Sequence, residues 1–349
     1  MEGMISQVRF ALLGCGRIAP RHVDCLTSGA VPGAKLTAVC DTKFERAKAI
    51  ADKFGVPAFA NQFEMLEKMG SEIDVVSILT PSGLHAKHAI EVADFRKHVV
   101  VEKPMALTLQ DADNMIEACK AAGVLLFVVR QNRYNYPIRK LRQALEAGRF
   151  GKLVLGTVRV RWSRTQKYYD QDSWRGTWAY DGGVFANQAL HHVDLLRWMM
   201  GEVESVIAKT SRALVDIETE DTGVVILRFK NGALGVIEAT TATRPKDLEG
   251  SISILGEKGS VEIGGFAVDE MKVWNFTEPQ PDDAEVLQKY RVNPPNVYGH
   301  TECLNKVVES IRDGQSALVG GLEDRKLLEL ISAIYKSAET GKEVFLSRP

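Results

Sequence analysis

The tripeptide Glu102-Lys103-Pro104 is the first stretch whose residue types could do chemistry. It follows Val99-Val100-Val101, a β-branched run typical of a short buried strand. Ligands of open α/β sheets bind beyond the carboxyl ends of the strands, so Lys103 is a candidate catalytic residue. A Lys–Pro peptide becomes cis at a cost of only ~0.5–1 kcal/mol, and a cis bond would direct the Lys103 side chain away from the strand axis. A surface lysine in an ordinary turn is the alternative, and the tripeptide alone does not separate the two.

A second candidate lies in residues 181–194, where a Gly-Gly turn leads into a predicted helix that ends near Met200. Asn187, His191 and Asp194 are spaced i, i+4 and i+7, which predicts that they share one helical face. Histidine is the usual proton carrier near neutral pH, so His191 is the candidate acid or base. The alternative is a buried histidine that is hydrogen-bonded to Asp194 or to the backbone.

Residues 14–19, with the sequence GCGRIA, form a GxGxxA motif directly after the apolar run 8–13. In this pattern Gly14 permits a tight turn, Gly16 lets a pyrophosphate approach the backbone, and the following helix offers its N–H groups to the phosphates. Asp41 ends the next predicted strand and is suited to accept hydrogen bonds from ribose hydroxyls. Because a carboxylate repels a 2′-phosphate, Asp41 favours NAD, whereas Lys43 leaves NADP open. Capping the next helix is the alternative role for Asp41.

Cations interleaved with aromatic residues form a candidate binding region for a phosphorylated ligand. Such side chains stack on a base or sugar and neutralise phosphates, and the alternative is an ordinary loop and sheet face. Residues 296–302 form another polar and aromatic patch at a predicted helix start, with helix capping as its alternative. Together with residues of the two motifs described above, these stretches supply the candidate substrate-binding residues. They are Lys103, Arg161, Arg164, Lys167, Tyr168, Arg175, Asn187, His191 and Tyr298.

The pattern of strands and helices along the sequence predicts an α/β protein with two domains, and these elements must position the candidate residues. Strands and helices alternate through the first third, which predicts a parallel Rossmann-type sheet. Beyond residue 134, period-two strands joined by short turns predict an α+β domain with a large, mostly antiparallel, open-faced sheet. We therefore predict domains at 1–133 and 134–349, with the C-terminal helices packing back on the first. The predicted helices include 44–54, 61–69, 109–122, 134–148, 299–313 and 322–340, and the predicted strands include 8–13, 36–40, 74–79, 124–129, 154–162, 203–211, 222–229, 234–241 and 251–255.

Composition excludes several classes of function. The 349 residues carry a formal net charge of -1 and a pI near 6.7, so no basic excess points to nucleic acid or to an anionic membrane. No signal peptide or membrane span is recognisable. The five cysteines are scattered without metal spacing, which favours reduced thiols in a cytoplasmic protein. His85 and His88 are spaced i,i+3 but lack a third ligand, so we expect no metal site there.

Taken together, these motifs resemble the Gfo/Idh/MocA oxidoreductase family over nearly the whole chain. The resemblance is carried by GCGRIA, by Thr80 to His85, by Glu102-Lys103-Pro104, by Asn132-Arg133 and by the glycine–helix motif. It implies NAD-dependent oxidation or reduction of a sugar or related alcohol, with Lys103 and His191 as the catalytic pair. The cofactor contacts that it implies are Gly14, Cys15, Gly16, Arg17, Ile18, Asp41, Thr80, Pro81, His85, Glu102, Lys103, Gln131 and Asn132.

Within the family, residues 167–188 resemble the WlbA/WbpB group of UDP-N-acetylglucosaminuronate 3-dehydrogenases of surface polysaccharide and lipopolysaccharide biosynthesis. The family pattern usually has an aspartate where this chain has Asn187, and an asparagine fits this group. Asn187 is suited to orient a substrate hydroxyl but not to take its proton. The resemblance further implies a UDP-sugar acid as substrate, NADH recycled by a 2-keto acid, and a homo-oligomer, dimer or tetramer, built on the sheet face that carries Arg159 and Arg161.

The sequence leaves two other functions open. One is an inositol or simple sugar dehydrogenase of the same family. The other is a non-catalytic NAD-binding regulatory protein, against which the presence of both Lys103 and His191 argues. The sequence does not decide which of these two residues is the base.

Overall fold

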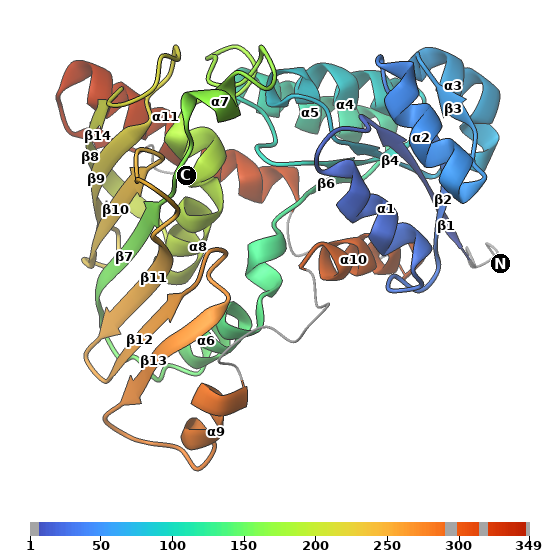
Figure 1. Cartoon of the computed structure of the whole chain (residues 1–349). Coiled ribbons are helices and arrows are strands. Elements are labelled where there is room, and N and C mark those ends of the chain that lie inside the picture. Colours follow the sequence, from blue (N-terminus) through green and yellow to red (C-terminus); the bar gives the residue numbers. More distant parts are fainter. Residues whose placement is uncertain (1–6, 290–298, 314–319, 347–349) are drawn as a thin grey trace. The chain divides into compact units, whose positions relative to one another are not determined.

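The computed structural model describes residues 7–289, 299–313 and 320–346, and the chain divides into two compact units. The first unit comprises Met1–Gln131 and Tyr298–Arg325, and the second comprises Asn132–Val297 and Lys326–Pro349 (Figure 1). The division thus falls two residues before the predicted boundary, and the predicted helix at 299–313 groups with the first unit.

The first unit is built on a parallel six-stranded sheet with the order β3-β2-β1-β4-β5-β6. The parallel Rossmann-type sheet predicted from the alternation is confirmed, and its strand order is the doubly wound one. The strands read as short apolar runs because helices cover both faces of such a sheet. The strands are β1 (Val8–Leu13), β2 (Ala34–Cys40), β3 (Ala58–Phe59), β4 (Val75–Ile78), β5 (His98–Val101) and β6 (Leu126–Val128).

The helices of the first unit begin and end at local signals. Asn61 caps α3 by accepting from the N–H groups of Phe63 and Glu64, and α2 and α5 end at left-handed Gly55 and Gly123. The predicted bounds 44–54 and 109–122 are confirmed. The helices are α1 (Ala19–Thr27), α2 (Phe44–Phe54), α3 (Gln62–Met69), α4 (His85–Asp94), α5 (Leu109–Ala122) and α10 (Gly299–Asp313).

The second unit is built on an eight-stranded sheet with the order β13-β12-β11-β7-β10-β9-β8-β14. Neighbours are antiparallel except for β7 and β10, which run parallel, so the mostly antiparallel sheet is confirmed. The strands are β7 (Leu153–Arg161), β8 (Val203–Ser211), β9 (Thr222–Phe229), β10 (Leu234–Thr240), β11 (Glu249–Gly256), β12 (Gly259–Gly264), β13 (Glu270–Phe276) and β14 (Val344–Phe345).

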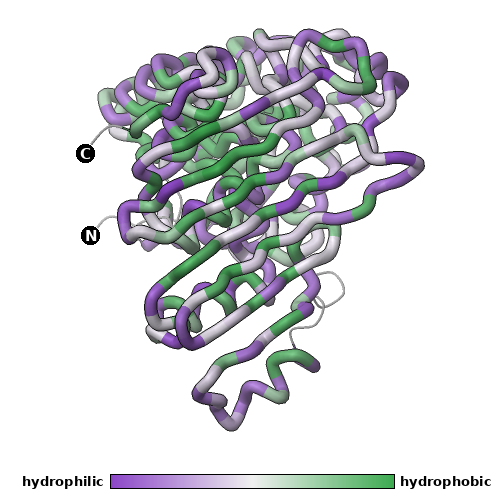
Figure 2. The backbone as a smooth tube through the Cα atoms, turned by 90° about the vertical axis from the view of Figure 1, so that its left-hand side faces the viewer, coloured by the Kyte–Doolittle hydropathy of each residue, from purple (hydrophilic) through white to green (hydrophobic). Residues whose placement is uncertain are grey.

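Alternation along these strands separates a buried face from an open face. Val158 and Val160 of β7 are fully buried in the core with α6 (Tyr136–Glu146), α8 (Leu190–Met200) and part of α11 (Gly321–Thr340). Arg159 and Arg161 therefore point to the other face. Figure 2 shows the sheet with helices behind it and with polar and apolar residues mixed along its strands.

The sequence did not predict several short elements. These are β3, β14, α7 (Gln166–Tyr169) and α9 (Asp283–Lys289). The helix predicted over 134–148 starts at Tyr136, because residues 131–134 form a separate 3₁₀ turn. In residues 7–289, 299–313 and 320–346, no helix is long and apolar enough to cross a membrane.

Candidate active site

The glycine turn after β1 is shaped by contacts with the ends of the neighbouring strands. Gly14 has a φ of +102°, and a Cβ there would lie 2.7 Å from the Leu79 carbonyl oxygen, so no other residue fits without displacing the backbone. By contrast, apart from Gly16 itself and its two chain neighbours, no atom of the described residues lies within 4 Å of the position that a Cβ on Gly16 would take. The turn is therefore tight at Gly14 and open at Gly16, directly before α1, as a pyrophosphate site requires.

Asp41 holds this turn from the end of β2. One of its carboxylate oxygens, Oδ2, accepts from the Cys15 N–H at 2.7 Å, and the other accepts from the Lys43 N–H at 2.8 Å. The bond to Lys43 lies one residue before α2 (Phe44–Phe54), whose N-cap is Lys43 without a side-chain cap hydrogen bond, so the alternative role of Asp41 as a helix cap is not seen. Each carboxylate oxygen accepts more than one hydrogen bond, which leaves capacity for ribose hydroxyls. The residues around the turn fit an NAD molecule.

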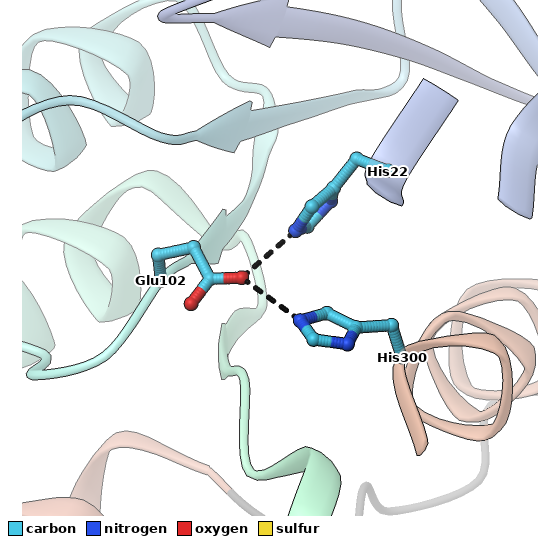
Figure 3. Close-up of side chains that lie close together, drawn as sticks. All are labelled: His22, Glu102 and His300. Carbon is cyan, nitrogen blue, oxygen red and sulfur yellow. Dashed lines mark hydrogen bonds and ion pairs between the residues drawn. The ribbon is translucent and has the colours of Figure 1, made fainter. Parts of the chain in front are cut away.

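Lys103 follows β5 and is half-buried, and its peptide bond to Pro104 is cis. The preceding Glu102 is buried, donates its own N–H to the carbonyl of Ile78 at 3.0 Å and accepts from the Lys103 N–H through Oε2 at 3.2 Å. The other carboxylate oxygen of Glu102 faces His22 and His300 (Figure 3). The family resemblance implies that Glu102 contacts the cofactor, but no sequence motif points to either histidine as its partner.

His85 ties the segment after β4 to the segment after Lys103. Its Nδ1 lies 2.7 Å from the carbonyl oxygen of Pro104, and its Nε2 lies 2.8 Å from that of Thr80. The hydroxyl of Thr80 in turn lies 3.0 Å from Nδ1 of His88. Burial lowers the pKa of His85 and lowers that of His88 to about 4. His85 therefore clamps the loop that contains Pro81 and Thr80, and its contact with the cofactor stays a prediction.

The predicted cofactor contacts Gln131 and Asn132 lie on opposite sides of the division between the two units. The carbonyl of Gln131 packs against Gly299 at the start of α10, where a Cβ would collide with it. The carbonyl of Asn132 accepts from the Asn135 N–H at 3.3 Å and so closes the turn before α6. Both residues shape backbone turns, and their contact with the cofactor stays a prediction.

In the second unit, His191 lies buried in the first turn of α8, three residues before Asp194. Both carboxylate oxygens of Asp194 accept from Arg133, at 2.6 Å from Nη2 and 2.7 Å from Nε. The Arg133 guanidinium also stacks on Trp198 at 4.8 Å. This buried bidentate pair fixes α8 and, with it, the position of His191.

Asn187 does not belong to α8. Residues Val184–Gln188 form a π-helical turn, in which the Ala189 N–H donates to the carbonyl of Val184 at 2.7 Å. The predicted shared face of Asn187, His191 and Asp194 is therefore wrong for Asn187, because the wider turn breaks the α-helical register. The side-chain amide of Asn187 instead donates to Asp181, whose other oxygen accepts from the Gly176 N–H at 2.6 Å.

The structure brings Arg164, Tyr168 and Arg175 together beside Asn187. The Tyr168 hydroxyl accepts from Arg175 at 2.9 Å and from Gln188 at 3.2 Å. Gln188 also accepts from Arg164 Nε at 3.2 Å and lies 3.4 Å from the Asn187 side-chain oxygen. The guanidinium carbons of Arg175 and Arg164 lie 4.7 and 5.4 Å from the centre of the Tyr168 ring. We call these three residues with Gln188 the cation–tyrosine cluster; Gln188 was missed, although it adjoins Asn187 in the same motif.

The other predicted substrate residues outside the two catalytic candidates are Arg161, Lys167 and Tyr298. Arg161 belongs to the open face of the sheet, away from α8, and pairs with Glu238 at 2.6 Å and Glu249 at 3.2 Å. Strand alternation places it on the face opposite the core, and its contact with the substrate stays a prediction. Lys167 is exposed on α7. Tyr298 lies outside the described residues.

Glu220 lies beneath the π turn and was not predicted. Its Oε1 accepts from the Tyr335 hydroxyl at 2.9 Å and from the Phe185 N–H at 3.3 Å. A Cβ on Gly183 would collide with this carboxylate, which explains the second glycine of the Gly-Gly turn. Burial raises the pKa of Glu220 to about 7, although these hydrogen bonds act in the opposite direction.

Comparison with known proteins covers both units. Residues 8–130 match the oxidoreductase family with an NAD-binding Rossmann fold, and residues 138–262 match the GFO/IDH/MocA C-terminal domain. The chain is 32% identical to the myo-inositol 2-dehydrogenase of Thermotoga maritima over 97% of this chain and 98% of that protein.

Two solved structures of WlbA dehydrogenases, each in complex with NADH and UDP-GlcNAcA, are also similar. The one from Chromobacterium violaceum is 42% identical with a TM-score of 0.92, covering 99% of this chain and 97% of that chain. The one from Bordetella pertussis is 43% identical with a TM-score of 0.90, covering 98% and 100%. This chain therefore belongs to the Gfo/Idh/MocA family and is an NAD-dependent oxidoreductase.

Proposed function

We propose that this enzyme oxidises the C3 hydroxyl of a UDP-sugar acid similar to UDP-N-acetylglucosaminuronate. The observation that carries the proposal is the cation–tyrosine cluster, which is hydrogen-bonded to the Asn187 turn in the same unit as His191. The WlbA structures that bind UDP-GlcNAcA are 42–43% identical to this chain, and they support the same substrate class.

The chemistry of the cluster favours an anionic ligand over a free polyol. Planar guanidinium groups match the geometry of carboxylates and phosphates. Asp247 and Asp172 flank Arg164 and Arg175 at 3.1 and 3.4 Å and hold them in place. A guanidinium has five N–H groups, so both arginines keep donors for a ligand. The exposed Lys167 adds a third cation nearby in the sequence.

We assign Lys103 and His191 as the catalytic pair. Bound NAD⁺ supplies the hydride acceptor. Lys103 acts either as the base or as a charged donor that stabilises the developing alkoxide, and His191 takes or relays the hydroxyl proton. Asn187, held by Asp181, orients a substrate hydroxyl and takes no proton.

Inositol or simple sugar oxidation is the second candidate function. It is supported by the 32% identity to myo-inositol 2-dehydrogenase and by 26% identity to the scyllo-inositol 2-dehydrogenase (NAD(+)) of Bacillus subtilis over 98% of this chain. The non-catalytic regulatory alternative is not supported, because the family is one of oxidoreductases.

Three finer features belong to the same proposal. A 2-keto acid recycles the NADH, and the product enters surface polysaccharide biosynthesis. The enzyme is a homo-oligomer, dimer or tetramer, joined through the open face of the sheet. On that face Ile207 lies opposite Ile226, which lies opposite Val236, and Ile207 and Ile226 are 42% and 53% exposed. A contiguous apolar strip of this kind is typical of an interface.

The test follows absorbance at the reduced-nicotinamide band with UDP-GlcNAcA, UDP-GlcNAc and myo-inositol, each with and without a 2-keto acid. We expect UDP-GlcNAcA alone to be oxidised, with turnover sustained by the keto acid. Reduction with borodeuteride followed by mass spectrometry should place the label at C3. Oxidation of myo-inositol with no response to UDP-GlcNAcA would refute the proposal and support the second candidate.

A further inference from the structure

Three buried side chains from distant parts of the sequence meet in the first unit. His22 comes from α1, Glu102 follows β5 and His300 is the second residue of α10. They are 0%, 6% and 8% exposed. Figure 3 shows both imidazole rings directed at the same carboxylate oxygen.

The protonation state of His22 follows from its surroundings. Its Nε2 lies 2.9 Å from Oε1 of Glu102, whereas its buried Nδ1 has no hydrogen-bond partner among the described residues. A buried N–H without an acceptor is costly, so the proton belongs on Nε2, which donates to Glu102. Burial lowers the pKa of His22, in agreement with a neutral ring.

His300 contributes a second and longer contact. Its Nε2 lies 3.4 Å from the same oxygen, which is within ion-pair range but beyond good hydrogen-bond geometry, and its ring packs edge-on against His22 at 5.6 Å. Burial alone would raise the pKa of Glu102, but the interactions with His22 and His300 outweigh it and hold that pKa well below the ordinary value. Glu102 is therefore a buried carboxylate that depends on these two rings.

We propose that His22 and His300 are positioning residues for the active site, which act by fixing Glu102 and, through it, the backbone of Lys103. This inference rests on the proposed role of Lys103. Oε1 of Glu102 faces the two histidines and Oε2 accepts from the Lys103 N–H at 3.2 Å, so the carboxylate links α1 and α10 to the lysine. Because α1 begins at Ala19, the last residue of the GxGxxA motif, the same link joins the helix that follows the glycine turn to Lys103.

Two imidazoles and a carboxylate can also bind a divalent metal ion. The ligand atoms of His22, Glu102 and His300 lie within 4.8 Å of one another, so these residues are a candidate metal site. The direct contact of 2.9 Å satisfies the His22 N–H and the carboxylate without an ion. We therefore infer a hydrogen-bonded cluster and not a metal site. The metal content of the purified protein is measured as part of the test.

The test compares leucine and glutamine at both positions. Leucine removes the donor, whereas the amide nitrogen of glutamine reproduces Nε2–H. We expect His22→Leu and His300→Leu to lower kcat about 10- to 100-fold, with little change in the KM of the sugar substrate, and the glutamine variants to recover most of the loss. Near-ultraviolet circular dichroism and NADH binding confirm that each variant is folded; should His22→Leu fail to fold, the His300 pair decides the test.

The pH profile separates positioning from a purely structural role. The groups that face Glu102 are His22 from α1, His300 and Cys303 from α10, His85 from α4 and the adjacent Lys103. Without a donor, Glu102 protonates at higher pH, so the acidic limb of the kcat profile should move upward in the leucine variants only. A merely structural role would change the amount of folded enzyme and leave the limb in place.

Selective acetylation gives a readout that needs no substrate. We expect the labelling rate of Lys103, measured by peptide mass spectrometry against the exposed Lys120 of α5, to change severalfold in the leucine variants and to return in the glutamine variants. Unchanged labelling with an unchanged acidic limb would overturn the inference. Stoichiometric metal in the wild type that is lost in His300→Leu would overturn it as well. Failure of the wild type to oxidise UDP-GlcNAcA would refute the proposed function alone.

Discussion

Replacing Glu220 with glutamine should stabilise the second unit above neutral pH. Glu220 is 6% exposed, and its carboxylate lies against Gly183 beneath the π turn that carries Asn187. Its Oε1 accepts from the Tyr335 hydroxyl and the Phe185 N–H, and a glutamine carbonyl oxygen keeps both bonds. The substitution therefore removes the negative charge and preserves the contacts.

The size of the effect follows from the pKa of Glu220, which burial raises from 4.5 to about 7. Because the folded chain binds this proton more tightly than the unfolded chain, the stabilisation is fully present below pH 4.5 and is lost as the pH rises through 7. The free energy of unfolding should fall by about 3 kcal/mol across that window. The free energy of unfolding of Glu220→Gln should not show this decline. At pH 8 it should be about 3 kcal/mol higher than that of the wild type, which corresponds to a Tm higher by ~6–12 °C.

Tryptophan fluorescence is a suited probe, because all five tryptophans lie in the second unit. Urea unfolding followed at pH 5 and pH 8 gives the free energy of unfolding of wild type and variant. The matched control is Glu339→Gln, which removes an exposed carboxylate from α11, the helix that carries Tyr335. Equal pH dependence in Glu220→Gln and wild type would show that Glu220 titrates normally and would refute the reasoning.

Four further substitutions test other parts of the structure. Lys103→Ala should lower turnover by about 10²-fold or more while NADH still binds, and unchanged turnover would dismiss its catalytic role. Asp194→Asn leaves the buried Arg133 without its counter-charge and should lower the free energy of unfolding by about 3–5 kcal/mol, so a loss below ~1 kcal/mol in urea would contradict the ion pair. Arg175→Met should raise the KM for the UDP-sugar about 10-fold or more and spare that for NAD⁺; equal changes in both would argue against a substrate contact. Ile226→Lys should dissociate the proposed oligomer in sedimentation velocity, and an unchanged sedimentation coefficient would contradict an interface on this face.

Where local signals dominate, the sequence predicted the fold closely. Helices 44–54 and 109–122 end at Gly55 and Gly123, and both glycines adopt the left-handed conformation that such ends favour. Asn61 caps its helix as predicted. In the first unit most of the parallel strands are rich in apolar residues, so their positions can be read without knowing their neighbours, whereas the two-residue β3 was not predicted.

The π turn shows why the site was harder to predict. Spacing assigned Asn187 to an α-helical face, but Glu220, more than thirty residues along the chain, accepts from the Phe185 N–H and occupies the space beside Gly183. A contact over that sequence distance leaves no periodic signal. Arg161 shows a related limit, because period two predicts that alternate residues share a face but not which face carries the site.

The proposed catalytic residues can be identified from sequence motifs, whereas the residues that position them can be identified only from the tertiary structure. Lys103 and His191 are proposed to act, and each lies in a short motif that spacing and strand ends reveal. Glu102 and Asp194 lie beside them, and their carboxylates are held by His22 and Arg133, eighty and sixty-one residues away in the sequence. Burying a carboxylate without a partner is costly, so each buried carboxylate next to a motif residue requires a donor from elsewhere in the fold. The motif therefore predicts that such a partner exists, and only the tertiary structure identifies it.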